Sequence, residues 1–431
     1  NVTSCVKSVL PAALLSLGAA LFTTNTLAED IWTRDKLTGD WGGLRSDLTK
    51  HGIDIDLRLT QYYQAVTDGG RDTNDEYGGT MDYRVKLAGD KLFGSWEGFW
   101  IDMHARSRWG DDIGQDSGAM TIPNTGMLMP LPDDYKDTDI TGLTVNQMFP
   151  IGETHLGLAT AGKLDIIDAV SLFFPHVGGG QEGFWNVNAL VSALPWFGAV
   201  DGLSLYGGWL ATINKEYQTG QSAVLVTGTE NVTTTMGEVS DSFDDVWVAA
   251  FHRFLYDIDG KPGYVMIFAG ASTREQASND PKDHVFIPGQ GIVNEDEEKP
   301  WDVALYLSQT LWQAEGDPSR KTTLLMGGTA GPDNPQFAQY NAFAAVETYG
   351  LFESRPHDRM GVSGWHNWLS DQFTDLVSPV ADLQDTWGFE LYYNYQIMPS
   401  VHLTADLQLI ENEWNEDDLA VVPGARLVID F

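Results

Sequence analysis

The chain has 431 residues, of which 61 are acidic and 25 are basic, so its formal net charge is −36. This charge argues against nucleic acid as a partner, because a surface that binds nucleic acid has to be basic. The one cysteine, Cys5, lies in a segment that we expect to be removed on export, which excludes disulfides and thiolate metal sites from the mature chain. We expect no cofactor.

Residues 1–28 are typical of a secretory signal peptide. Lys7 supplies a positive charge near the start, an apolar stretch follows from Ser8 to Phe22, and Thr26-Leu27-Ala28 resembles a cleavage site. Beyond residue 28, the sequence has no apolar run long enough to cross a bilayer as a helix. An exported soluble protein fits this pattern, and so does a membrane β-barrel, whose strands alternate apolar and polar residues.

Alternation with a period of two is the strongest pattern in the chain. In residues 53–60, isoleucine and leucine occupy the odd positions, whereas aspartate, arginine and threonine occupy the even positions. Residues 401–409 alternate in the same way, and so does the end of the chain at 426–431. Each such segment predicts a β-strand with one polar and one apolar face, and the polar face could meet water outside a sandwich or inside a channel.

About sixteen segments alternate in this way, and each is close to the length of a tilted membrane strand. They are 53–64, 80–90, 97–109, 141–149, 153–165, 184–194, 202–214, 244–257, 263–273, 300–313, 320–330, 337–353, 358–369, 385–397, 401–412 and 425–431. Short and long connections alternate along the chain, and the long ones are 110–140, 166–183, 215–243, 274–299 and 413–424. A membrane barrel sorts its connections like this, because one rim has tight turns and the other has long loops. The sequence therefore predicts an all-β fold, a 16-stranded antiparallel transmembrane β-barrel over residues 53–431.

Aromatic residues add to the case for a membrane. Many of the 15 tryptophans fall near predicted strand ends, where amphipathic rings favour the membrane interfaces. Phe431 closes an alternating strand and resembles the terminal signal that the barrel-assembly machinery recognises. We therefore expect the outer membrane of a Gram-negative bacterium, with lipid and lipopolysaccharide around the barrel.

Residues 35–53 resemble the N-terminal signature of the OprB-type carbohydrate-selective porins. The likeness rests on Gly39-Asp40-Trp41-Gly42-Gly43 with Arg45, Leu48 and Gly52-Ile53, and it continues at Tyr83-Arg84, 106–108 and 162–165. The resemblance implies a sixteen-stranded outer-membrane barrel through which glucose and similar monosaccharides diffuse. It also implies a short N-terminal helical segment at the periplasmic end, within residues 29–52. Leu44 and Leu48 lie four residues apart and Gly52 suits a helix end, so the local residues predict the same helix.

Neighbouring residues of a strand point to opposite faces, so the odd or even position of a residue, which we call its parity, predicts whether its side chain points into the lumen. Several of the predicted inward residues are lysine or arginine, although the chain has only 25 of these residues, so their grouping on one inner wall is unlikely to arise by chance. The predicted pore-lining and substrate-binding residues are Arg58, Tyr62, Arg84, Lys86, Asp102, Arg106, Arg108, Lys163 and Asp165. Two interpretations stay open: the cations pair with lumen acids to stiffen the wall, or they form a constriction that selects solutes.

A constriction of arginine and acid side chains suits a sugar. Sugar hydroxyls donate and accept hydrogen bonds, so arginine donors and carboxylate acceptors can replace part of their hydration. Binding has to be weak, because a channel must release what it binds. The function we expect is therefore passive diffusion of glucose-like sugars, and a general or small-organic-acid porin is the alternative. Residues of the loops 110–140 or 166–183 could fold inward, and the sequence leaves both monomer and homotrimer open.

Other classes of protein fit the sequence less well. An outer-membrane barrel hydrolase would need a nucleophile, but Gly361-Val362-Ser363-Gly364-Trp365-His366 lacks the complete nucleophile elbow. We therefore expect that the protein is not an enzyme. A soluble secreted sugar-binding β-protein is the third hypothesis. The acidic run at 294–298 lacks the spacing of a calcium loop, so we expect no metal site.

Overall fold

The computed structural model describes residues 30–127, 137–174, 181–189, 198–232, 239–289 and 291–431. The predicted signal peptide, residues 1–28, lies outside the described residues. In the part of the chain that is described, no helix has the length and hydrophobicity of a membrane span.

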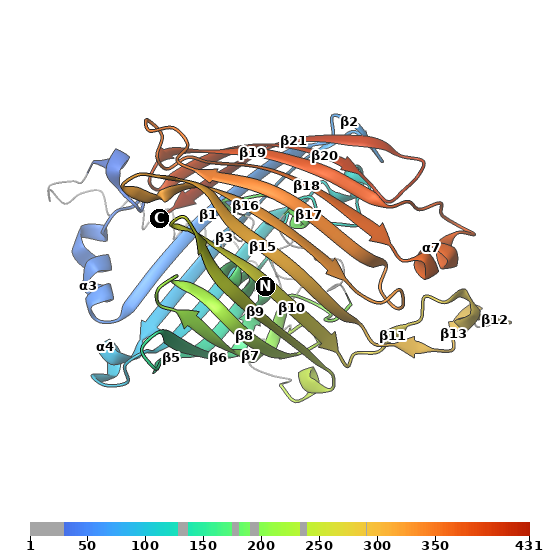
Figure 1. The fold of residues 1–431 in the computed structure, drawn as a ribbon, viewed down its shortest axis with the longest axis horizontal. Helices are drawn as coiled ribbons and strands as arrows, with labels where there is room; N and C mark the ends of the chain where they lie inside the picture. The colour runs from blue at the N-terminus through green and yellow to red at the C-terminus, as the bar shows by residue number, and fades with distance from the viewer. Residues whose placement is uncertain (1–29, 128–136, 175–180, 190–197, 233–238, 290) are drawn as a thin grey trace, which may run out of the picture.

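Sixteen long antiparallel strands form one closed barrel, as the sequence predicts (Figure 1). Each long strand pairs with the next along the chain, and the first pairs with the last, where Arg58 lies opposite Asp430. The short strand β2 (Asp68–Gly70) adds to β21 at one rim. The long strands are β1 (Ile53–Ala65), β3 (Asp75–Ala88), β4 (Phe99–Gly110), β5 (Thr138–Ile151), β6 (His155–Asp165), β7 (Ser204–Asn214), β8 (Thr219–Gly228), β9 (Val246–Ile258), β10 (Lys261–Ser272), β15 (Trp301–Ala314), β16 (Asp317–Ala330), β17 (Ala338–Tyr349), β18 (Arg359–Leu369), β19 (Thr386–Met398), β20 (Val401–Glu411) and β21 (Asp418–Asp430).

The two faces of the strands meet different surroundings. On β15, the apolar side chains of Val303 and Leu305 are exposed on the outside, whereas Asp302 and Tyr306 are buried within the barrel. An apolar outer wall with polar residues inside is the pattern of a barrel surrounded by lipid. The alternation read from the sequence therefore assigns the faces of this strand correctly.

One predicted strand is wrong. Of the predicted strand 184–194, the structure describes residues 184–189, which do not join the sheet and contain only the turn of 3-10 helix η5 (Val187–Ala189). Residues 190–194 lie outside the described residues. Phe184 packs edge-on against Tyr392 of β19 with ring centroids 4.8 Å apart, and Trp185 is fully buried. This segment is apolar because it folds into the barrel and packs there, and not because it faces lipid.

One strand was missed, because the predicted long connection 215–243 contains β8. The short turn 215–218 joins β7 to β8, and Val224 and Val226 of β8 point outward. The inward residues Ala223 and Leu225 are also apolar, since they pack in the hydrophobic cluster inside the barrel. In the middle of β8, therefore, neither face is polar, and the alternation that identifies the other strands is interrupted.

The connections are sorted between the two rims. One rim has the short turns 152–154, 259–260, 315–316 and 399–400, and it also carries α3 and α4, whereas α7, β12 and β13 lie at the other rim (Figure 1). The elements at the first rim are η2 (Ile31–Thr33), η3 (Trp41–Gly43), α3 (Leu44–Lys50) and α4 (Gly89–Phe93). The elements in the connections of the second rim are α5 (Gly114–Ser117), α6 (Ile166–Phe173), η5, η7 (Asp241–Phe243), β11 (Gln276–Ala277), η8 (Pro281–Asp283), β12 (His284–Ile287), β13 (Gly291–Asn294), β14 (Glu297–Glu298) and α7 (Asp371–Val377).

The predicted N-terminal helix is α3, and the turn before it closes against the end of the barrel. Gly42 and Gly43 have φ angles of 71° and 100°, which side chains with a Cβ rarely adopt. This turn directs Arg45 to the last strand, where its Nη2 donates to the carbonyl oxygen of Phe431 at 2.6 Å. The guanidinium group also lies 4.2 Å from the ring centroid of Trp41.

Candidate functional site

Helix α6 lies inside the barrel, directly after β6. Asp165 caps its first turn, because its Oδ1 accepts hydrogen bonds from the backbone amides of Ile167 at 3.0 Å and Asp168 at 3.3 Å. The apolar side of the helix packs against the inner wall, where the Phe173 ring lies 5.2 Å from the Phe251 ring of β9. The cap directs Asp168 toward strands β3 and β4, which lie beyond β5 in the sheet.

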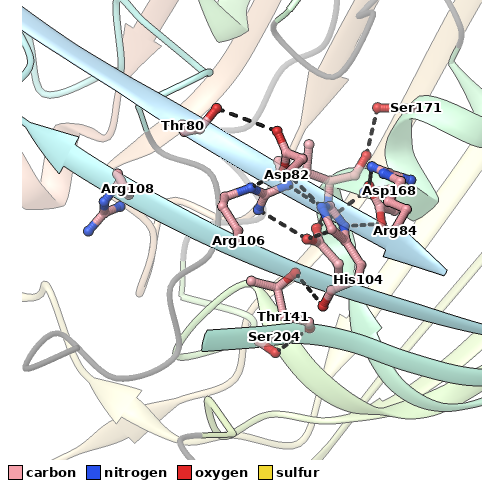
Figure 2. A network of polar contacts seen from close by, with 12 residues as sticks. Thr80, Asp82, Arg84, His104, Arg106, Arg108, Thr141, Asp168, Ser171 and Ser204 are labelled. Carbon is pink, nitrogen blue, oxygen red and sulfur yellow. Dashed lines mark hydrogen bonds and ion pairs between the residues drawn. The ribbon is translucent and has the colours of Figure 1, made fainter. Parts of the chain in front are cut away.

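Asp168 joins a network of charged groups on those two strands (Figure 2). Its Oδ2 lies 2.7 Å from Nδ1 of His104, and its Oδ1 lies 2.6 Å from Nη2 of Arg84. His104 Nε2 lies 2.8 Å from Oδ1 of Asp82, which also accepts from Nε of Arg106 at 2.7 Å. The strand register explains this grouping, because Asp82 lies opposite Arg106 and Arg84 lies opposite His104.

A second group of ion pairs lies where the first strand, β1, pairs with the last strand, β21. Arg58 donates through Nε to Asp430 at 2.7 Å and pairs through Nη1 with Glu182 at 2.9 Å. Gln181, next to Glu182, donates to Oδ2 of Asp82 at 2.7 Å. Residues of the connection after α6 therefore complete both groups of charges.

These groups surround a cavity of about 560 Å³, which we call the constriction cavity. Arg84 and Asp168 line it and also line a neighbouring cavity of about 370 Å³, which we call the side cavity. The ion pair between these two residues therefore borders both cavities. The lining of the constriction cavity is Lys36, Asp56, Arg58, Asp82, Arg84, Arg106, Ile167, Asp168, Ser171, Leu172, Gln181, Glu182 and Asp430.

Six of the nine predicted site residues line one or both of these cavities, and three do not. Arg58, Arg84 and Arg106 line the constriction cavity, and the side cavity is lined by Arg84, Lys86, Asp102 and Asp165. The remaining three predicted residues lie outside both cavities, and they are Tyr62, Arg108 and Lys163.

Packing explains where those three residues lie. Tyr62 is buried with its ring 5.7 Å from that of Trp185. Arg108 donates to the carbonyl oxygen of Met127 at 3.1 Å, and Figure 2 shows it apart from the charged network. Lys163 is only 2 % exposed. Inward parity thus places a side chain inside the barrel, but inward loops cover some of these side chains.

Several residues of the network were not among the predicted site residues. Asp82 and His104 have inward parity, so the alternation of β3 and β4 could have identified them. Asp168, Gln181 and Glu182 come from a connection, where strand parity gives no signal. Only the capping pattern of Asp165 before an apolar stretch hints that a helix starts there.

A metal ion is disfavoured at the one cluster of metal-ligand type in the described residues. Donor atoms of His104, Asp165 and Asp168 lie within 4.8 Å of one another. However, Arg84 and Arg106 already contact the same carboxylates, so a cation would have to displace a guanidinium group.

The serine of the incomplete nucleophile motif has a structural role. Ser363 is buried on β18, and its Oγ donates to the carbonyl oxygen of Ala189 at 2.6 Å. The hydroxyl group therefore helps to fasten the segment that folds into the barrel.

Comparison with known proteins shows a likeness to one family of porins. Residues 247–431 match the family described as "Carbohydrate-selective porin, OprB family". QuiX of Acinetobacter baylyi, which is described as a porin, is 23% identical over 456 residues that cover 96% of this chain and 97% of QuiX. The high-pH structure of Pseudomonas putida OprB has the same fold, with a TM-score of 0.75, 17% identity and coverage of 94% of this chain and 100% of that chain. Its low-pH structure gives a TM-score of 0.54 at 14% identity, covering 93% and 99%. The chain therefore resembles the OprB family of carbohydrate-selective porins over residues 247–431, and it shares the barrel fold of Pseudomonas putida OprB, as expected for a channel of the Gram-negative outer membrane.

Proposed function

We propose that neutral monosaccharides such as glucose diffuse passively through this barrel, past a constriction in which Arg58 and Arg84 contact the sugar. The observation that carries this proposal is the constriction cavity of about 560 Å³, which is lined by both guanidinium groups and carboxylates. Together they offer a sugar both donors and acceptors of hydrogen bonds.

The charge balance of the cavity favours a neutral solute. Four cationic and five acidic side chains line it, and Arg58, Arg84 and Arg106 each contact a carboxylate within 2.7 Å. A small organic acid would need a cation that is not already neutralised, so this balance counts against the organic-acid alternative. Weak contacts to neutral hydroxyls also suit a channel, since the solute has to leave.

The arginines divide into two roles in this proposal. The side chains of Arg58 and Arg84 are 29% and 49% exposed, so they can contact a solute while keeping their carboxylate partners. The side chain of Arg106 is 1% exposed and donates to both Asp82 and Asp165. Arg106 therefore holds the wall in place, and does not itself touch the sugar.

The orientation we propose places the rim of α3 and the short turns in the periplasm. Outer-membrane barrels have their short turns on that side and their long loops outside the cell. In this orientation Lys36, which pairs with Asp56 at 2.6 Å, lies where the constriction cavity opens toward the N-terminal segment. Phe431 would then be available to the assembly machinery, and lipid and lipopolysaccharide would surround the wall.

Planar-bilayer recordings test this function. Arg58→Ala and Arg84→Ala should each raise single-channel conductance and weaken the block by glucose, because each removes bulk and a donor from the cavity. Arg355→Ala is the control, since Arg355 pairs with Asp358 in a turn at the rim and does not line the cavity. Conductance and glucose block that stay at wild-type values in both cavity variants would contradict the proposal.

A further inference from the structure

The side cavity has two walls of different chemistry. Its polar wall comes from neighbouring strands, where Lys86 lies opposite Asp102 and Trp100 lies opposite Asn146. Its apolar wall comes from β5, β6, β7 and α6 and includes Met148, Leu158, Leu164, Leu172 and Ile213. A cavity of about 370 Å³ that sets a polar wall against an apolar wall has features of a small-ligand site.

The polar wall is held in a fixed arrangement. Trp100 Nε1 donates to Oδ2 of Asp102 at 2.6 Å, and Asn146 Nδ2 donates to the same oxygen at 3.2 Å. The Nζ of Lys86 lies 4.8 Å from the centroid of the Trp100 ring. Among the described residues, no hydrogen bond uses Oδ1 of Asp102, so this oxygen keeps its capacity to accept.

We propose that the side cavity is a second binding station for a neutral pyranose, separate from the constriction. A pyranose has an apolar C–H face and a hydroxyl edge. The Trp100 ring suits the C–H face, while Asp102 Oδ1 and Lys86 Nζ suit the hydroxyls as acceptor and donor. This inference rests on the proposed function, because it assumes that sugars reach the lumen.

The charges around the side cavity exclude an anion as its preferred ligand. Three carboxylates line it, those of Asp102, Asp165 and Asp168, against the cations Arg84 and Lys86. The Arg84–Asp168 pair borders both cavities, so a sugar that leaves one station is next to the other. Two weak stations in series allow diffusion without tight binding at either.

Trp100→Leu tests the station by removing the flat ring. We expect glucose to reside about five-fold more briefly in the channel, which corresponds to the loss of one aromatic contact. Trp96→Leu is the matched control, since Trp96 is 57% exposed, stacks on Phe99 at 4.1 Å and does not line either cavity. Residence times in Trp100→Leu equal to those of the wild type would overturn the proposal.

A second measurement locates the sugar without removing the tryptophan. Thr144 lines the side cavity, and the chain's one cysteine, Cys5, lies in the predicted signal peptide, so Thr144→Cys would give a single site for a methanethiosulfonate reagent. Glucose should slow labelling at this position and leave labelling of Ser319→Cys, at the rim, unchanged. Equal labelling rates with and without glucose would refute the station.

These outcomes separate the two proposals. If glucose blocks the wild-type channel, but Trp100→Leu and the labelling show no effect, the side cavity is not a station and the constriction stands. If glucose blocks no channel at all, the proposed function fails and the station fails with it.

Discussion

The carboxylate of Glu390, on β19, accepts a hydrogen bond from the backbone amide of Trp185 at 2.6 Å. Its other oxygen accepts from the amide of Asn186 at 2.9 Å. One strand side chain thus fastens the segment 181–189, whose first residues reach Asp82 and Arg58 in the constriction cavity. Arg426 of β21 adds a bond to the carbonyl oxygen of Gly183 at 2.9 Å.

Glu390→Ala should therefore loosen the constriction although Glu390 does not line it. The substitution leaves two buried amides without their acceptor, and each such loss costs about 1–3 kcal/mol. We expect a higher and noisier single-channel conductance with weaker glucose block. Glu390→Gln keeps one acceptor oxygen and should fall between Glu390→Ala and the wild type. A conductance trace of Glu390→Ala that matches the wild type would show that the segment is held by other contacts.

Arg253, on β9, should fix helix α6 in a similar way. Its Nη1 donates to the carbonyl oxygen of Gly220 at 2.5 Å and its Nη2 donates to that of Phe173, the last residue of α6. Arg253→Met keeps apolar volume beside Phe251 but leaves both carbonyls without this donor, so we expect a loss of about 1–3 kcal/mol in unfolding free energy. Thermal unfolding in detergent measures this loss. The surface variant Lys282→Met is the control, and equal stability of the two variants would contradict the role of Arg253.

Arg45→Ala should weaken the contact between the N-terminal segment and the closing strand. It removes the bond to Phe431 and the contact with the Trp41 ring, and we expect a loss of about 1 kcal/mol because the group is only partly buried. The unfolding temperature of the barrel, read from its gel shift on heating, measures this loss. The control is Lys50→Ala, which changes an exposed residue of the same helix. The prediction is wrong if the two variants unfold at one temperature.

Glu413, between β20 and β21, should make stability depend on pH. Burial raises the pKa of its carboxyl group to about 7, although its Oε2 accepts from the backbone amide of Met120 at 2.8 Å. The pKa of Glu413 in the folded protein lies above its unfolded value. The contribution of this group to stability is therefore fully present below about pH 4.5 and is lost as the pH rises through 7. We expect a loss on the order of 1–3 kcal/mol between pH 5 and pH 8.

Glu413→Gln provides the comparison for this pH dependence. The amide keeps an oxygen for Met120 and cannot ionise, so the variant should lose less stability than the wild type over the same range. Thermal unfolding at both pH values measures the difference. Parallel pH profiles for wild type and Glu413→Gln would assign the effect to other groups.

The sequence predicts the wall of this protein better than its interior. Alternation identifies a strand such as β15, because lipid outside and polar groups inside impose opposite demands on neighbouring residues. It fails at β8, where Ala223 and Leu225 face an apolar cluster inside the barrel. It also misreads the segment around Phe184, whose apolar residues pack on the inner wall.

The same limit applies to the candidate site. Parity places Arg58 and Arg84 in the lumen, since their strands follow the rule. It cannot show that Asp168 and Glu182 meet them, because these acids come from a connection whose path depends on tertiary packing. Nor can it show that Arg106 is covered while Arg84 remains half exposed.

The central claim is that a neutral sugar, and not an anion, is the preferred solute of the constriction. Swelling of liposomes that contain the purified protein measures this directly, with glucose and gluconate compared at equal osmolarity and protein-free liposomes as the baseline. The balanced charges around Arg58 and Arg84 predict faster swelling in glucose. Swelling in gluconate that is as fast or faster would contradict the account.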